Sequence, residues 1–471
     1  MSDTQYDIVV IGAGPGGYVA AIRAAQLGLK TAVVERKYWG GVCLNIGCIP
    51  TKALLHTADL LEDAREGKRF GVVAQQVTLD FGAAMQNKDR VVKQSTSGVS
   101  FLMKKNKIDT YNGTARLTGR GSIQVAGEDG KQTNLAAKNV IIATGARPRE
   151  LPQIGATIDE DRILSSTGML SLKEVPKSLL LIGASAIGCE FASMYHAFGS
   201  EITIVEALPR IVPVEEEEIS AELTKAFTKR GIKVMAGAKL SGVDRSESQV
   251  VATITDAEGK EQKIAAERML LGIGVQSNTQ DLGLEELGVA LDQRGSIKVD
   301  GMQRTSVEGV YAIGDCAVTG PWLAHKASAE GIVAAEHIAG HHPPEIDYDK
   351  VPGCTYCNPE IASVGLTEAK ARERGYDVKV GKFPFSANAK ARILGQPIGF
   401  VKVVSDTKYG EVLGIHIIGP HATELIAEGG VALSHEATAE SLMRTIHAHP
   451  TLYEALGQAE HAAAEGAAID I

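Results

Sequence analysis

The sequence has few cysteines, no long apolar run and no block of basic residues. Its 471 residues include only 6 Cys, too few for the disulfide framework that stabilises small secreted proteins. No apolar run approaches the ~20 residues of a membrane-spanning helix. The formal net charge is −9, and Lys and Arg are not gathered into a stretch that would bind nucleic acid. These absences argue against a secreted, membrane-bound or nucleic-acid-binding protein.

The composition is that of a folded protein with large buried cores. Hydrophobic residues make up 44% of the chain and charged residues 22%, as in ordinary globular domains. A chain of this length predicts about three domains of roughly 150 residues each. Residues 1–7 have neither the apolar stretch of a signal peptide nor the arginines of a transit peptide. We therefore expect a cytoplasmic protein.

A dinucleotide-binding βαβ unit is predicted at the start of the chain. Residues 6–10 are β-rich and lead into a glycine-rich turn, which is followed by alanines at helical spacing and a second strand over residues 31–34. In such a unit one glycine makes the turn, another lets a pyrophosphate approach and a third lets the helix pack on the strand. These glycines are Gly12, Gly14 and Gly17. Glu35, at the end of the second strand, is placed to accept hydrogen bonds from an adenosine ribose.

A second βαβ unit begins at residue 178, where an apolar strand again leads into a glycine turn. Its landmarks Gly183, Gly188, Gly199 and Glu206 repeat the spacing of Gly12, Gly17, Gly28 and Glu35. The repeat of a whole supersecondary unit predicts a second dinucleotide site.

Three residues bear on the nucleotide that the second unit takes. Ser185 stands where the pyrophosphate-facing glycine is expected, so the unit either binds weakly or hydrogen-bonds the phosphate through the hydroxyl. Glu206 favours NAD over NADP because a carboxylate suits a free ribose 2′-hydroxyl. Arg210 is close enough in sequence to keep a 2′-phosphate open as the alternative.

Cys43 and Cys48 stand close enough in the sequence to close a small disulfide loop, with glycines before and between them. So short a loop gains little from chain entropy, so stability is a poor reason for the pair. A disulfide that opens and closes in a reaction cycle is a better one. His449, followed by Glu454, has the spacing of a base and its orienting acid, and thiol–disulfide exchange needs a base to form the thiolate.

Further glycine turns and one helix start complete the predicted cofactor sites. Buried strands end in glycine turns at Gly145 and Gly274, and another ends at Gly314-Asp315, where the aspartate can meet ribose or ribityl hydroxyls. A helix beginning near Ala324 and His325 presents an N-terminus that favours negative charge on a reduced cofactor. We expect its backbone, rather than the His325 imidazole, to make the contact.

The segments between and after the nucleotide units are also predicted. Residues 108–112, 115–117 and 122–125 are expected to form a small antiparallel sheet. Residues 341–344 are expected to be a linker to a separate C-terminal α+β domain. Cys354 and Cys357 form a CxxC without a second pair at metal spacing, so we expect two buried thiols and no metal site.

These motifs, in this order, resemble the flavin-dependent pyridine nucleotide–disulfide oxidoreductases over nearly the whole chain. The resemblance implies that Gly12, Gly14, Gly17, Glu35, Gly145, Asp315, Ala324 and His325 contact FAD, and that Gly183, Gly188, Glu206 and Gly274 contact NAD. It also implies that Cys43 is the thiol attacked by substrate and that Cys48 faces the flavin. Lys52 matches the lysine beside the flavin, and Glu190 matches the acid that pairs with it. His449 and Glu454 match the catalytic base and its orienter, which reach the disulfide from the other subunit of a homodimer.

The resulting fold class is α/β, with two Rossmann-like dinucleotide-binding domains and a C-terminal α+β dimerisation domain. The predicted boundaries are 1–150 for the first part of the FAD domain, 151–279 for the NAD domain, 280–346 for the returning FAD segment and 347–471 for the dimerisation domain.

The activity that the resemblance implies is oxidation of protein-bound dihydrolipoamide to lipoamide through the Cys43–Cys48 disulfide and FAD, with reduction of NAD⁺ to NADH. The expected partners are lipoyl domains of 2-oxoacid dehydrogenase complexes or the glycine-cleavage carrier protein. Glutathione and mercuric reductases usually continue their disulfide stretch differently from Ile49-Pro50-Thr51-Lys52. Two alternatives remain: a related flavin enzyme acting on another disulfide, and an FAD-loaded docking subunit whose NAD site has decayed.

Overall fold

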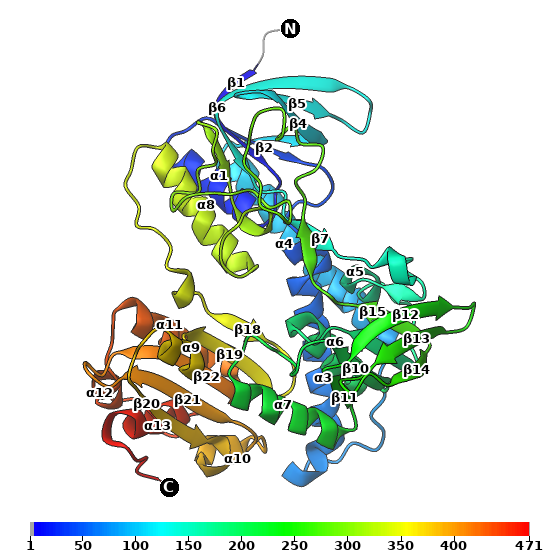
Figure 1. The fold of residues 1–471 in the computed structure, drawn as a ribbon, viewed down its shortest axis with the longest axis vertical. Helices are drawn as coiled ribbons and strands as arrows, with labels where there is room; N and C mark the ends of the chain where they lie inside the picture. The colour runs from blue at the N-terminus through cyan, green and yellow to red at the C-terminus, as the bar shows by residue number, and fades with distance from the viewer. Residues whose placement is uncertain (1–3, 471) are drawn as a thin grey trace. The chain divides into compact units, whose positions relative to one another are not determined.

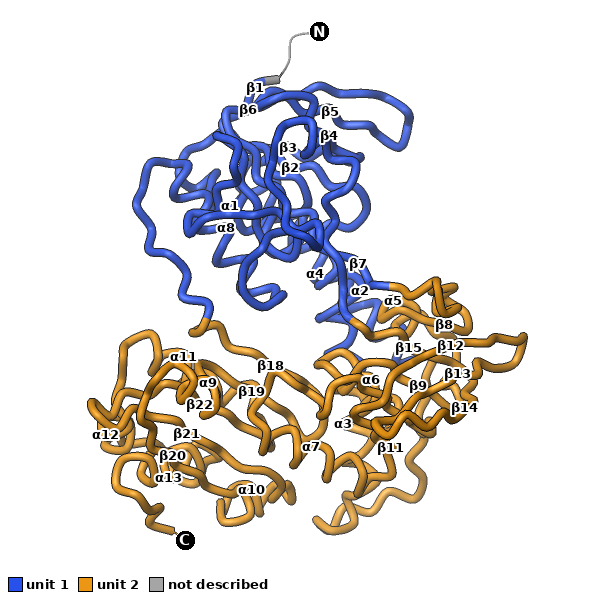
Figure 2. Tube along the Cα trace, in the orientation of Figure 1, with its two compact units in different colours: residues 1–54, 82–149, 274–348 blue, residues 55–81, 150–273, 349–471 orange. Residues whose placement is uncertain are grey.

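Two β-sheets, one mixed and one parallel, organise the chain, and each has a glycine-rich turn after a central strand (Figure 1). The computed structural model describes residues 4–470. They form two compact units (Figure 2): unit 1 holds residues 4–54, 82–149 and 274–348, and unit 2 holds residues 55–81, 150–273 and 349–470. Helix α3 (Cys48–Glu66) starts in unit 1 and continues in unit 2.

The main sheet of unit 1 has the strand order β3-β2-β1-β6-β5-β4, with β17 beside β6. Strands β3, β2, β1, β6 and β17 are parallel neighbours, whereas β4, β5 and the first part of β6 form an antiparallel meander. The elements of unit 1 are β1 (Thr4–Ile11), α1 (Pro15–Gln26), β2 (Thr31–Glu35), α2 (Gly41–Ile46), α4 (Phe81–Lys105), β3 (Asp109–Asn112), β4 (Thr114–Gly119), β5 (Ser122–Ala126), β6 (Gln132–Ile142), β7 (Ala146–Pro148), β16 (Val275–Ser277), β17 (Val310–Ala312) and α8 (Ala324–Ile338).

The prediction of a small antiparallel sheet is wrong for its first strand. β3 pairs in parallel with β2, with Ala32 opposite Asp109. The long helix α4 ends just before β3 and returns the chain to the edge of the sheet, and such a helical crossover produces a parallel neighbour.

Both faces of the unit 1 sheet are buried, which explains why its central strands are apolar throughout. Alternate residues of β1 enter different cores. Ile8 and Val10 pack with α1 and α8 on one face, and Val9 and Ile11 pack with β4 and β5 on the other. Figure 1 shows α1 and α8 side by side against the sheet.

Unit 2 contains the second parallel sheet, in the order β11-β10-β9-β15-β8, and an antiparallel sheet β12-β13-β14. The elements of this part are β8 (Ile163–Leu164), α5 (Ser166–Met169), β9 (Ser178–Ile182), α6 (Ala186–Phe198), β10 (Glu201–Glu206), α7 (Glu217–Arg230), β11 (Lys233–Ala236), β12 (Lys239–Arg245), β13 (Val250–Thr255), β14 (Glu261–Ala266) and β15 (Arg268–Leu271).

The C-terminal part of unit 2 is an antiparallel sheet in the order β18-β19-β22-β21-β20, covered by helices. Residues of α11 and α13 share one core with β19 to β22. The elements are β18 (Gly353–Thr355), β19 (Glu360–Gly365), α9 (Glu368–Glu373), β20 (Val378–Pro384), α10 (Ala389–Ile393), β21 (Phe400–Asp406), β22 (Val412–Gly419), α11 (Ala422–Ser434), α12 (Ala439–Met443) and α13 (Tyr453–Glu465). In residues 4–470, no helix has the length and apolar character to cross a membrane.

Candidate active site

In the turn between β1 and α1, two glycines are required for packing, whereas the third has room for a side chain. Gly12 has a φ of +106°, and a Cβ there would lie 2.3 Å from the Ala143 carbonyl oxygen. A Cβ at Gly17 would lie 2.0 Å from the Gly12 oxygen. At Gly14 the nearest atom would be Gly41 Cα at 3.9 Å. The packing of the turn does not need a glycine at position 14, and a residue without a side chain there agrees with the close approach of a dinucleotide pyrophosphate.

Glu35 is held against this turn by backbone hydrogen bonds. Its Oε2 accepts from Ala13 N at 2.7 Å, and its Oε1 accepts from Lys37 N at 2.7 Å and Tyr38 N at 3.0 Å. A carboxylate has about four acceptor positions, so it can still accept a hydrogen bond from a ribose hydroxyl. These residues fit the adenosine half of a dinucleotide cofactor such as FAD.

The turn between β9 and α6 repeats this geometry. Gly183 has a φ of +101°, and a Cβ there would lie 2.2 Å from the Gly272 oxygen. A Cβ at Gly188 would lie 2.0 Å from the Gly183 oxygen. Glu206 Oε2 accepts from Ala184 N at 2.7 Å. The turn, the helix packing and the acid are therefore all built as in the first unit.

Ser185 is the one difference between the two turns. It is the N-cap residue of α6, but its side chain makes no capping hydrogen bond and is exposed. Its Cβ and hydroxyl stand at the helix N-terminus, at the position where Gly14 leaves the first turn open. The serine contributes no capping bond to α6, so a role for its hydroxyl would lie with a ligand.

Arg210 is tied into its own loop. Its guanidinium donates to the carbonyl oxygens of Pro213 at 3.1 Å and Glu215 at 3.2 Å. These contacts direct the cation to the backbone of residues 213–215, and the acid Glu206 remains at the end of β10. The arrangement favours a free ribose 2′-hydroxyl over a 2′-phosphate.

The turn after β17 carries Asp315 and is fastened by a buried ion pair. Gly314 N donates to Glu330 Oε2 at 2.7 Å, and Glu330 Oε1 lies 3.2 Å from Lys326 Nζ, with both side chains fully buried. Burial raises the pKa of Asp315, and the Lys326 cation opposes that rise. Sequence reasoning missed Glu330; the Lys–Glu spacing of four residues in an alanine-rich helix is the signal that points to it.

Ala324 and His325 begin helix α8, next to this turn in the chain. Leu323 is the N-cap residue and provides no side-chain cap. The N-terminus of a helix favours negative charge. The His325 side chain is exposed. The contact of these residues with a cofactor remains a prediction.

Gly145 and Gly274 flank a short two-stranded sheet of β7 and β16. Asn278 N donates to Gly145 O at 2.9 Å, and Gly274 O accepts from Arg149 N at 3.1 Å. Thr144 Oγ1 donates to Asn278 O at 2.6 Å. Both glycines belong to unit 1, and the role predicted for Gly274 in NAD binding remains a prediction.

Cys43 and Cys48 lie at the junction of two helices. Cys43 is in α2, and Cys48 is the first residue of α3. The hydrogen bond with Cys48 and burial raise the pKa of the Cys43 thiol, whereas the Lys52 cation opposes the rise. The raised pKa of Cys43 makes the two sulfurs inequivalent. The role of Cys48 as the thiolate that faces the flavin remains a prediction.

His449 and Glu454 form the predicted pair. His449 Nδ1 lies 2.7 Å from Glu454 Oε1, and Glu454 Oε2 accepts from Thr451 N at 2.8 Å. Burial alone would raise the pKa of Glu454, but the bonds from His449 and Thr451 outweigh it and lower that pKa. The His449 side chain is 74% exposed. Its imidazole is oriented by the acid on one side and presents Nε2 to the surroundings.

Glu190 and Lys52 lie in different units, and their pairing remains a prediction. Glu190 is buried in α6, and its Oε1 accepts from Tyr356 N at 3.0 Å.

In the CxxC, Cys357 is buried and Cys354 is only half-buried, so the expectation of two buried thiols is wrong for Cys354. Within residues 4–470, no three His, Cys, Asp or Glu residues come together as metal ligands.

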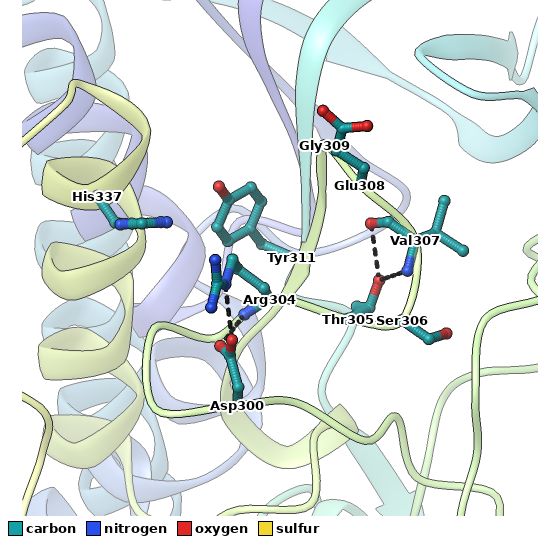
Figure 3. Close-up of a pocket in the computed structure, with 9 residues that line it drawn as sticks. All are labelled: Asp300, Arg304, Thr305, Ser306, Val307, Glu308, Gly309, Tyr311 and His337. Carbon is teal, nitrogen blue, oxygen red and sulfur yellow. Dashed lines mark hydrogen bonds and ion pairs between the residues drawn. The ribbon is translucent and has the colours of Figure 1, made fainter.

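A cavity of about 480 Å³ lies in unit 1, at the start of β17 rather than at its glycine turn. Figure 3 shows Arg304 paired with Asp300 and the ring of Tyr311 lying toward His337. Neither the cysteines nor the glycine turns line this cavity. Since ligands of parallel sheets bind at the carboxyl ends of the strands, the cavity is unrelated to the candidate site.

Two family models match the chain. The first, described as pyridine nucleotide-disulphide oxidoreductase, matches residues 6–331, and the second, the dimerisation domain of these enzymes, matches residues 351–460. The chain belongs to the pyridine nucleotide-disulphide oxidoreductase family. The family and the fold class predicted from the sequence are thus confirmed, and the dimerisation domain supports a homodimer. The finer domain boundaries remain a prediction.

Relatives within this family resemble the chain over nearly its full length. Dihydrolipoyl dehydrogenase of Rhizobium etli is 49% identical and is covered over 97% of each chain. Dihydrolipoyl dehydrogenase of Bacillus subtilis is 46% identical, with 99% of each chain covered. Among solved structures, LpdA from Mycobacterium tuberculosis has a TM-score of 0.90 at 27% identity, covering 97% of this chain and 99% of that one. The HOCl-induced flavoprotein disulfide reductase RclA from Escherichia coli, as its Cu(II) complex, has a TM-score of 0.87 at 28% identity over 97% and 99% of the chains.

Proposed function

We propose that this protein is a dihydrolipoyl dehydrogenase, which oxidises protein-bound dihydrolipoamide to lipoamide and reduces NAD⁺ to NADH. The observation that carries the proposal is the near-full-length similarity to dihydrolipoyl dehydrogenases, in a chain that retains the Cys43–Cys48 pair and the His449–Glu454 pair. The enzymes of this group use FAD and NAD. FAD, when bound, supplies two-electron transfer between the thiol pair and the nicotinamide.

Each of the two glycine turns binds one cofactor. Gly12, Gly14, Gly17 and Glu35 hold FAD, together with Gly145, Asp315 and the start of α8. Gly183, Gly188, Glu206 and Gly274 hold NAD. Lys52 lies beside the flavin, and Glu190 pairs with it. The open space at Gly14 and the backbone-held carboxylates of Glu35 and Glu206 support this assignment.

The thiol chemistry follows from the unequal sulfurs and the oriented histidine. His449 removes a proton from one dihydrolipoamide thiol, and the thiolate attacks Cys43 Sγ of the Cys43–Cys48 disulfide. A mixed disulfide forms with Cys43, and Cys48 leaves as a thiolate. The second substrate thiol then attacks the substrate sulfur of the mixed disulfide, which releases lipoamide and leaves both cysteines reduced. Glu454 stabilises the protonated His449 between these steps.

The homodimer is part of this mechanism. His449 is exposed on its own chain, as a base that serves the disulfide of the partner subunit would be. The substrates are lipoyl domains of 2-oxoacid dehydrogenase complexes or of the glycine-cleavage carrier protein, and the location is the cytoplasm. The small number of cysteines supports a reducing compartment.

A reductase for another disulfide is the second candidate, because RclA shares the fold at 28% identity. Mixing the purified holoenzyme with dihydrolipoamide and NAD⁺ distinguishes these functions. We expect NADH formation at a rate far above that with NADP⁺. Rapid NADPH oxidation with glutathione disulfide, without NADH formation, would favour the reductase. Bleaching of the flavin by dihydrolipoamide without NADH formation would indicate a decayed NAD site in a docking subunit.

A further inference from the structure

His447 fastens the loop that carries His449. His447 is partly buried, whereas all the remaining residues of the segment 444–450 are exposed. Its Nε2 lies 2.9 Å from Glu428 Oε1 and its Nδ1 lies 3.0 Å from the Thr445 carbonyl oxygen. Both partners are acceptors, so both contacts are hydrogen bonds only when the imidazole is doubly protonated and positively charged.

Tyr453 connects this histidine to helix α13. The rings of His447 and Tyr453 are stacked, with centroids 3.4 Å apart and an interplanar angle of 19°. A cation over an aromatic face is favoured by the ring quadrupole. The Tyr453 hydroxyl lies 3.0 Å from Glu460 Oε2. Burial raises the pKa of this phenol, and Glu460 and Glu428 raise it further. His447 is thus held by α11 through Glu428 and by α13 through Tyr453.

Glu460 has one hydrogen-bond partner among the residues described. Its Oε2 lies 3.0 Å from the Tyr453 hydroxyl, and its Oε1 has no partner. The Glu460 side chain is fully buried, and no cation of the described residues pairs with it. A buried carboxyl group without a cation favours its neutral form. Glu460 therefore keeps its proton, which it can donate to the phenol oxygen.

The raised pKa of Glu460 agrees with a protonated carboxyl group. Burial raises the pKa of Glu460 to about 8, the Tyr453 hydrogen bond opposes the rise and the Glu428 charge adds to it. The charged groups on α13 and on β20, β21 and α12, which pack against it, have other partners, except for Glu465, which is exposed at the end of α13. These groups are Lys379 with Ala464 O, Lys382 with Glu218, Lys402 with Glu216 and Glu368, Asp406 with Tyr409 N, Glu440 with Arg444, Glu454 with His449, and His461 with Ala467 O.

We propose that Glu428, Tyr453 and Glu460 are positioning residues for the His449–Glu454 pair, and that they act as such while Glu460 keeps its proton. Once that proton is lost, a buried carboxylate without a cation faces the Tyr453 hydroxyl, and Glu428 opposes its charge. The position of Tyr453 then changes, and the stack that holds His447 loosens. The inference rests on the proposed role of His449 as the base.

The test compares the pH dependence of NADH formation from dihydrolipoamide in the holoenzyme and in two variants. Glu460→Gln replaces the acid with a neutral amide that still donates to Tyr453 but cannot ionise. Tyr453→Phe keeps the ring over His447 and removes the hydroxyl. The matched controls are Glu465→Gln, an exposed acid on the same helix, and Tyr409→Phe, whose side chain is 68% exposed.

We expect wild-type activity to fall above pH about 8, where Glu460 ionises, and this fall to be absent or shifted to higher pH in Glu460→Gln. Tyr453→Phe should lower kcat by about three- to tenfold at neutral pH, with KM for NAD⁺ and the flavin content unchanged. Both controls should follow the wild type. Identical pH profiles of the wild type and Glu460→Gln, or an unchanged kcat in Tyr453→Phe, would overturn the inference.

Thermal unfolding of the same holoenzymes gives a readout that does not depend on turnover. Folding raises the pKa of Glu460, so its stabilising contribution is complete below the ordinary carboxyl range and is lost as the pH rises toward about 8. The Tm difference between Glu460→Gln and the wild type should grow over this window, and coincident Tm curves would overturn the protonation of Glu460. A wild type that forms no NADH would contradict the proposed function, whereas an active wild type with unaffected variants would contradict only this inference.

Discussion

Glu206 accepts a hydrogen bond of 2.7 Å from the backbone N–H of Ala184. Glu35 accepts one of the same length from Ala13 in the first unit. In both units the carboxylate at the end of the second strand is thus bound to the glycine turn. The acid that would meet the ribose is fixed in place by the turn that would meet the pyrophosphate, so the two halves of each site are preorganised together.

The exposed serine at the α6 turn yields the first prediction. Ser185→Gly should lower KM for NAD⁺ by roughly threefold, because the change removes a Cβ and a hydroxyl from the helix N-terminus that the pyrophosphate approaches. The Ser185 side chain caps nothing, so Tm should stay nearly constant. Steady-state kinetics with Ser185→Ala as the control separate the two groups. A higher KM in both variants would show instead that the hydroxyl binds the phosphate.

The glycines of the first turn should differ in what they support. A Cβ at Gly17 would lie 2.0 Å from the Gly12 oxygen, so Gly17→Ala should destabilise unit 1 by about 3 kcal/mol or more. Gly14→Ala has room for its methyl group and should fold, but it should bind less FAD. Thermal unfolding and the ratio of flavin to protein test both. Full flavin content in Gly14→Ala would contradict the placement of the pyrophosphate.

The unequal cysteines lead to a spectroscopic prediction. The pKa of Cys43 is raised by its hydrogen bond with Cys48, so we expect Cys48 to be the thiolate. As isolated with FAD, Cys43→Ser should show a long-wavelength absorption band from a thiolate beside the oxidised flavin, and Cys48→Ser should lack it. Both variants should lose turnover with dihydrolipoamide. The band in Cys48→Ser instead would exchange the two roles.

The histidine and its acid should contribute unequally to the rate. His449→Gln should lower kcat with dihydrolipoamide by about 10²–10⁴-fold, the range of a lost general base. Glu454→Gln should cost less, because an amide can still accept a hydrogen bond from the imidazole although it no longer stabilises its charge. The flavin spectrum of both variants should match that of the wild type. Equal losses in the two variants would show that the acid takes part directly.

A mixture of monomers tests whether His449 serves the partner subunit. Heterodimers that combine Cys43→Ser in one chain with His449→Gln in the other keep one intact pair of cysteine and histidine if the base acts across subunits. We expect about half of the wild-type activity from them, and almost none from either homodimeric variant. Inactive heterodimers would place the base on the same chain as its disulfide.

Most of the candidate site could be predicted from local motifs in the sequence. The spacing of Gly12, Gly17 and Glu35 dictates a turn, a helix and an acid because each acts on neighbours a few residues away. His449 and Glu454 likewise meet because they stand five residues apart. The order of these motifs was enough to indicate the family. The direction of β3 was wrong because it depends on where a long helix returns the chain, which no local pattern contains.

The sequence by itself determined the chemistry of this protein: two nucleotide turns, one cysteine pair, and one histidine with its acid. Only the tertiary structure decided which groups support them. Lys326 and Glu330 form a buried pair that holds the Gly314 turn, and Glu428 and Tyr453 meet at His447 from different helices. Such contacts depend on burial and on distances between segments far apart in the chain, since a carboxylate becomes a positioning group only when folding removes water from it and brings its partners together.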